Sequence, residues 1–158
     1  MSLITERAEE FSGALPNGGV LLGLDPGTKT IGTALCDAGW RFATAAKTLE
    51  RGKFSRDAAA LKEIIRERAV RGIVCGLPRN MNGTEGARAQ SVRSLVRNLS
   101  GTLTLPILLW DERWSTVSAE RHLIGQDFSR AKRATMIDAH AAAVILQAAI
   151  DRLTQVGD

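Results

Sequence analysis

Three separated groups of acidic residues have the type and placement that could hold a catalytic metal. Asp25 ends an apolar run, Asp111 and Glu112 follow another apolar run, and Asp138 lies in an alanine-rich stretch. Carboxylate oxygens are hard ligands that bind Mg²⁺ or Mn²⁺. A pair of such ions activates a water molecule and stabilises the leaving oxygen in phosphodiester hydrolysis. The acids therefore predict a metal-dependent nuclease.

Each of these acids also has an ordinary structural explanation. Asp25 could accept hydrogen bonds from the amides of a turn, and Asp111 or Glu112 could cap a loop while Arg113 pairs with a neighbour. Consecutive strand residues point to opposite faces, so one of these two acids is expected to face Asp25, and spacing does not choose between them. Asp138 is favoured in an early helical turn by the helix dipole, which does not explain why it shares a face with apolar residues. If all these acids are structural, the chain is a non-catalytic RNA-binding module.

Patterns of apolar residues define the elements that position these acids. They predict a mixed α/β fold with helices flanking one sheet, over a single domain of residues 19–158. Residues 1–18 are expected to be a loosely ordered extension. Strands are predicted over 20–24, 30–37, 41–49, 72–78 and 105–110, and helices over 56–69, 85–99, from about 116, and over 135–153.

Charge and composition point to a polyanionic partner. The net charge is +4, and sixteen arginines stand against five lysines. The planar guanidinium fork suits phosphate contacts, which favours a nucleic acid. No apolar run is long enough to span a bilayer, and the N-terminus lacks a signal-peptide pattern, so a cytoplasmic location is expected. The same patterns predict buried thiols at Cys36 and Cys75, and Trp114, although able to stack on a base, is expected in the core.

Four stretches resemble the YqgF/RuvX family of RNase H-like proteins, which are described as Holliday junction resolvases and pre-16S rRNA nucleases. Together they cover most of residues 20–153. The stretches are LGLDPGTKTIGTALCD (22–37), IVCGLPRNMNGTEG (73–86), LPILLWDERWSTVSAERHL (105–123) and KRATMIDAHAAAVILQAAID (132–151).

This resemblance implies an RNase H-like fold with a five-stranded mixed sheet of order 3-2-1-4-5, in which strand 2 is antiparallel. It also implies a nuclease that uses Mg²⁺ or Mn²⁺ and matures the 5′ end of 16S rRNA during ribosome biogenesis. Its substrate would be pre-16S rRNA, free or within a pre-ribosomal particle. Resolution of DNA junctions and metal-independent RNA binding remain the alternatives, and both a monomer and a homodimer are compatible with the sequence.

Carried over by position, the resemblance assigns roles to individual residues. Asp25 would be the acid of the first strand, Asp111 or Glu112 that of the fifth, and Asp138 that of the final helix. Substrate contacts would come from Lys29, Asn80, Gly83, Glu85, Arg113 and Thr116. The chain departs from the family where DERWST replaces the usual DERLTT. It also has GLP where RuvC-type resolvases carry an acid at the end of the fourth strand.

Overall fold

The structure is a computed structural model that describes residues 1–115 and 130–156, with only the backbone described for 130–138. Its centre is a six-stranded mixed sheet of order β1-β6-β5-β2-β3-β4. None of the helices in the described ranges is long and apolar enough to cross a membrane. The helix expected from about residue 116 lies outside the described residues.

Five of the six strands follow the predicted order. β2 pairs antiparallel with β3, β3 pairs antiparallel with β4, and β2–β5 and β5–β6 are parallel pairs. The mixed α/β fold and the order 3-2-1-4-5 are therefore confirmed. The strand bounds are β2 Leu21–Pro26, β3 Thr30–Cys36, β4 Ala43–Glu50, β5 Gly72–Leu77 and β6 Ile107–Asp111.

A sixth strand comes from the N-terminal residues, so the predicted count of five was too low. β1 (Ile4–Thr5) pairs in parallel with β6, and helix α1 (Ala8–Ala14) follows it. The Phe11 side chain is fully buried, and its Cζ lies 2.9 Å from where a Cβ on Gly72 would stand. We expected residues 1–18 to be a loosely ordered extension, but the structure packs part of this segment against the sheet. β1 forms hydrogen bonds with the edge strand β6, and Phe11 fills the space above Gly72.

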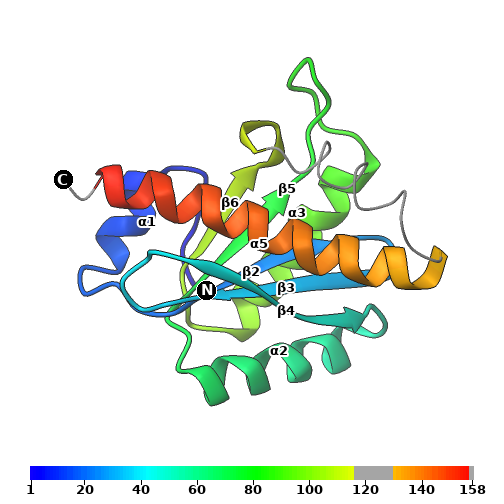
Figure 1. The fold of residues 1–158 in the computed structure, drawn as a ribbon, viewed down its shortest axis with the longest axis horizontal. Coiled ribbons are helices and arrows are strands. Elements are labelled where there is room, and N and C mark those ends of the chain that lie inside the picture. The colour runs from blue at the N-terminus through cyan, green and yellow to red at the C-terminus, as the bar shows by residue number, and fades with distance from the viewer. Residues whose placement is uncertain (116–129, 157–158) are drawn as a thin grey trace.

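Helices cover both faces of the sheet (Figure 1). The long helix α5 (Arg130–Val156) crosses one face, while α2 (Phe54–Arg68) and α3 (Ala87–Thr102) lie on the other. Each face has its own apolar core. α5 approaches the sheet closely, because a Cβ on Gly23 would stand only 2.9 Å from the Leu146 Cβ.

Candidate active site

Asp25 lies at the carboxyl end of β2, on the face covered by α5. Side chains alternate along a strand, so Asp25 shares the face of Leu21 and Gly23. Leu21 belongs to the α5 core, and Gly23 lies directly beneath Leu146. The Asp25 side chain is almost completely buried, with 1% of its surface exposed. A carboxylate at this depth requires compensating contacts, because burial of an isolated charge costs several kcal/mol.

Glu112 reaches the same face from the end of β6. A Cβ on Gly76 would stand 2.9 Å from the Glu112 Oε1 and 2.7 Å from the Ile145 Cδ1 of α5. The last paired residues of β2 and β5 are Leu24 and Cys75, and Asp25 and Gly76 come next on these two strands. Asp25 and Glu112 therefore flank Gly76 on adjoining strands. The missing side chain of Gly76 lets Glu112 and Ile145 come close to β5 on this face.

The electrostatic effect of the two acids is felt by Cys75. Burial raises the pKa of its thiol far above the ordinary value, and the negative charges of Asp25 and Glu112 raise it further. Burial also raises the pKa of Cys36, to about 11. Both cysteines are free thiols in the core, as the sequence predicted. At neutral pH they are protonated and unreactive.

Asp111 has a different environment from its neighbour Glu112. Its Oδ2 accepts hydrogen bonds from the Arg113 Nη2 at 2.7 Å and the Arg79 Nη1 at 3.2 Å. The Asp111 Oδ1 accepts from the backbone N–H of Arg113 at 2.9 Å, which starts the short 3-10 helix η1 (Glu112–Trp114). Burial alone would raise the pKa of Asp111, but the hydrogen bonds from Arg113 and Arg79 outweigh it and lower the pKa. Asp111 is thus an ionised anchor for arginines, which leaves Glu112 as the acid beside Asp25.

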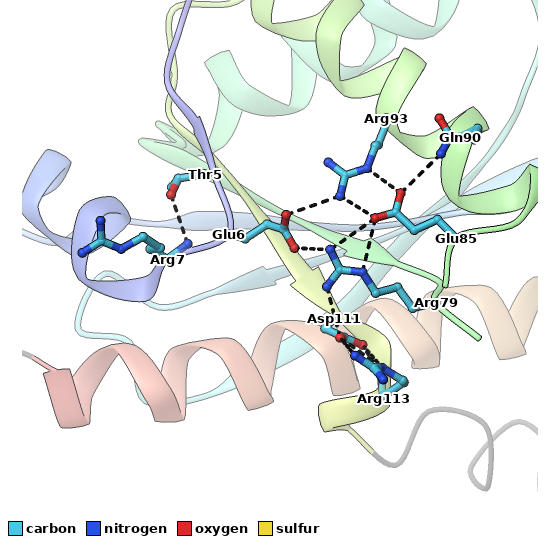
Figure 2. Close-up of polar contacts among 9 residues, drawn as sticks. All are labelled: Thr5, Glu6, Arg7, Arg79, Glu85, Gln90, Arg93, Asp111 and Arg113. Carbon is cyan, nitrogen blue, oxygen red and sulfur yellow. Dashed lines mark hydrogen bonds and ion pairs between the residues drawn. The ribbon is translucent and has the colours of Figure 1, made fainter. Parts of the chain in front are cut away.

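Asp111 belongs to an arginine cluster, which we define as Arg79, Arg93 and Arg113 with Glu6, Glu85 and Asp111 (Figure 2). Glu85 accepts from the Arg93 Nε at 2.6 Å and Nη2 at 2.7 Å, and from Arg79 at 3.3 Å. The hydrogen bonds from Arg93 and the charges of both arginines hold the pKa of Glu85 at about 2, although burial opposes this. Glu6 joins the cluster from the N-terminal segment through Arg79 and Arg93. The predicted substrate residue Glu85 is therefore occupied with arginines of its own chain.

The loop between β5 and α3 is closed on itself and rests on Arg113. The Asn80 Nδ2 donates to the Thr84 hydroxyl at 2.9 Å, and the Gly83 N–H donates to the Asn80 carbonyl at 2.8 Å. Gly83 has φ +87°, a left-handed conformation that favours glycine. The Arg113 Nη1 donates to the Met81 carbonyl at 3.4 Å. Arg113 thus joins this exposed loop to Asp111 at the end of β6.

The other predicted site residues lie away from this loop or outside the part of the chain that the structure describes. Lys29 is exposed in the turn between β2 and β3, where its carbonyl accepts from the Arg51 N–H. Asp138 belongs to α5, one turn before the buried Ala142, and its side chain lies outside the described set. Thr116 lies wholly outside the described residues. Among the side chains that are described, no three His, Cys, Asp or Glu residues are grouped closely enough to hold a metal ion.

Comparison with known proteins identifies the family. Residues 19–152 match the model of the RuvX family, described as Holliday junction resolvase. The chain belongs to the RuvX family. It is 61% identical to a Novosphingobium aromaticivorans protein named as a candidate pre-16S rRNA nuclease, over 96% of this chain and 97% of that protein. A protein of the same name from Sphingopyxis alaskensis is 58% identical over 97% of this chain and all of that protein.

A solved structure supports the same fold. Thermus thermophilus RuvC, in complex with a Holliday junction substrate, aligns with this chain with a TM-score of 0.51 and a sequence identity of 12%. The alignment covers 87% of this chain and 97% of the RuvC chain. At this identity the likeness shows the fold alone. The RuvX chain thus has the RNase H-like architecture that its motifs implied.

The sequence did not predict the roles of several residues of this RuvX chain. Arg79 and Arg93 hold the loop and the end of β6, and Gly76 lets Glu112 come close to β5. Arg79 directly follows the strand-ending Pro78, a position that could have indicated a role at the sheet edge. The expectation that Trp114 lies in the core was wrong, since 62% of its surface is exposed. Trp110 fills that core position instead, and the two rings meet edge to face with centroids 5.6 Å apart.

Proposed function

We propose that this RuvX chain is a divalent-metal-dependent nuclease whose metal site includes Asp25 and Glu112. The observation that carries the proposal is the placement of both carboxylates on the α5 face, on either side of Gly76. Asp25 is buried and Glu112 is partly buried, and a bound cation would offset the repulsion between two such neighbouring carboxylates. The nuclease names of the RuvX relatives support the same activity.

The donor chemistry fits Mg²⁺ or Mn²⁺. Both side chains offer hard carboxylate oxygens, and the absence of a side chain on Gly76 lets the Glu112 Oε1 come close to β5 on the face that carries Asp25. We propose Asp138 as the third acid, because its spacing to the buried Ala142 and Ile145 in the sequence is that of residues on one helix face. Asp111 is left out of the ligand set, since arginines occupy both of its oxygens. When bound, the metal supplies an activated water and stabilises the leaving oxygen.

The rest of the site holds and orients the nucleic acid. Arg113 and the loop of residues 79–86 form one unit next to the acids, and we propose that Asn80, Gly83 and Arg113 face the substrate there. Lys29, in the exposed β2–β3 turn, is proposed as a phosphate contact, and Thr116 is kept as a further proposed contact on its sequence match. Glu85 is proposed to act indirectly, by fixing Arg79 and Arg93.

We propose the 5′ end of 16S rRNA, in a cytoplasmic precursor, as the substrate. The curated relatives carry this name, and an excess of arginine over lysine suits an RNA backbone. The RuvX description favours a second candidate, a four-way DNA junction. Oligomeric state does not enter the proposal, which holds equally for a monomer and a homodimer.

The test is cleavage of labelled 16S-precursor RNA and of a four-way DNA junction, each with Mn²⁺ or with EDTA. The wild type is compared with Asp25→Asn and with Glu63→Gln, which removes an exposed charge on α2. Metal-dependent cutting of the RNA that is lost only in Asp25→Asn supports the proposal. Cutting of the junction alone moves the function to recombination. Salt-sensitive binding without cleavage of either would mean a non-catalytic assembly factor.

A further inference from the structure

A cavity beside η1 is lined by Trp110 of β6 and Trp114 of η1. Its volume is about 630 Å³, and it lies between α1, the C-terminal half of α5 and the end of β6. We call it the tryptophan cavity and define it by Trp110, Trp114, Arg7, Asp151 and Gln155 among its lining residues. Its size is in the range of pockets that take small ligands or single groups of larger ones.

The tryptophan cavity adjoins the proposed metal site. Trp114 ends the three-residue helix η1 that begins with Glu112, and Trp110 is the β6 partner of Gly76. β6 and β2 are separated only by β5, which corresponds to about 10 Å at ordinary strand spacing. A nucleotide next to one bound at Asp25 and Glu112 is therefore within reach of the Trp114 ring.

The two rings are arranged so that one supports the other. Trp110 is buried, and it meets Trp114 at an interplanar angle of 85°. A contact at this angle covers at most one of the two flat faces of Trp114, in agreement with its exposed fraction of 62%. A large exposed aromatic ring held in place by a buried one is suited to stacking, at little cost in side-chain entropy.

The charges around the tryptophan cavity favour a base over a phosphate in its interior. Glu6, Glu9 and Asp151 line it beside Arg7 and Arg152, and Glu6 is already paired with Arg79 and Arg93. Carboxylates repel a phosphate but accept hydrogen bonds from base N–H groups, a role that is left to Asp151. Arg152 is paired with Glu9 at 3.3 Å. Arg7 is a lining residue whose guanidinium makes no hydrogen bond or ion pair to any residue that the structure describes, so it is available to a phosphate next to the bound base.

We propose that the tryptophan cavity binds one unpaired nucleobase of the substrate, stacked on Trp114, with the neighbouring phosphate at Arg7. This inference rests on the proposed function and makes it more specific. The substrate strand would be single-stranded on the side of the cleaved phosphate that faces β6. Stacking depends on the π-face, so the site accepts any base.

The test measures RNA binding by the full chain in EDTA, so that it does not depend on cleavage. The probes are a short fluorescein-labelled single-stranded RNA, the same RNA paired into a duplex, and an abasic version. Trp114→Ala is expected to weaken single-strand binding about 5- to 150-fold, the loss of one stacked base, and Trp114→Phe should restore most of it. The duplex and the abasic strand should bind both variants and the wild type alike.

Phe42→Ala is the matched control, because Phe42 is also an exposed aromatic residue but lines a different pocket near β4. Its affinity should equal that of the wild type. Equal single-strand affinity of Trp114→Ala and wild type overturns the inference and leaves the nuclease proposal standing. An equal loss on single strand and duplex also overturns it, since that indicates general contact without stacking. A selective single-strand loss in a chain that cleaves nothing keeps the base site and overturns the nuclease proposal.

Discussion

Asp111 and Glu112 are adjacent in the chain, yet they belong to opposite electrostatic environments. Asp111 accepts hydrogen bonds from Arg79 and Arg113, and its pKa is lowered. Glu112 turns to the α5 face, where its Oε1 lies over Gly76 and its charge acts on Cys75 together with that of Asp25. One carboxylate is neutralised by arginines of its own chain, and the other lies on the face of Asp25, where a bound cation would offset the repulsion between the two acids.

The comparison shows how one strand end serves two purposes. The Asp111 side chain caps η1 and secures the arginine cluster, which gives the end of β6 a fixed geometry. In this geometry Glu112 points to the α5 face, and Trp114 lies at the surface. A stabilising acid and an acid proposed to do chemistry should therefore respond differently to substitution.

The largest expected effect is on catalysis by Glu112. Glu112→Gln should lower metal-dependent RNA cleavage by at least about 10³-fold, because it removes a proposed metal ligand. Its thermal unfolding temperature should be equal to or higher than that of the wild type, since one of two neighbouring negative charges is removed. Cleavage assays and calorimetry on the same preparation check both parts. Full activity in this variant would exclude Glu112 from the site.

Asp111 should show the opposite pattern. Asp111→Ala is expected to lower the free energy of unfolding by about 3 kcal/mol, because Arg79 and Arg113 lose a buried acceptor. Urea unfolding of the two variants side by side measures the difference. A loss below about 1 kcal/mol would mean that the arginine cluster does not anchor β6.

A substitution at Gly76 tests whether the position of Glu112 beside β5 matters for metal binding. Gly76→Ala places a Cβ 2.7 Å from the Ile145 Cδ1 and 2.9 Å from the Glu112 Oε1, so α5 or Glu112 must move. Overpacking of this kind costs about 1–3 kcal/mol, and Mn²⁺ binding measured by titration calorimetry should weaken. Gly101→Ala is the control, because a Cβ in that position of α3 meets nothing within 4 Å. Equal Mn²⁺ affinity in both variants would argue against a metal between Asp25 and Glu112.

The smallest effect concerns the acid stability of the arginine cluster. The pKa of Glu85 is lowered from 4.5 to about 2, so ionised Glu85 stabilises the fold fully above about pH 4.5. This contribution is lost as the pH falls towards 2. Glu85→Gln should therefore be less stable than wild type by on the order of 1 to 2 kcal/mol at pH 7, and the two should converge near pH 2. Urea unfolding across this pH range, with Glu63→Gln as the exposed control, checks the trend, which a constant difference would contradict.

Much of the fold followed from local patterns. Apolar runs ended by turn residues placed the strands of the sheet, and the acid at the end of the first run marked the end of β2. The alanine-rich pattern predicted α5, although the helix begins at Arg130, five residues earlier than expected. These features are local because side-chain periodicity and turn chemistry act over a few residues.

The choice between Asp111 and Glu112 could not be made from the sequence. Both follow the same strand, and a one-residue shift exchanges the face to which each points. The choice was made by Arg79 and Arg113, one of them 32 residues away along the chain, which bind Asp111 and turn the backbone into η1. The sixth strand and the exposure of Trp114 also depend on distant partners, since β1 needs the edge of β6 and Trp114 is displaced by Trp110.

The sequence by itself determined the order of the elements, the family and the acids available for chemistry, because these depend on residue types and their spacing. Only the tertiary structure decided which acid accompanies Asp25 and which is neutralised by arginine, because burial and ion pairing arise when distant segments meet.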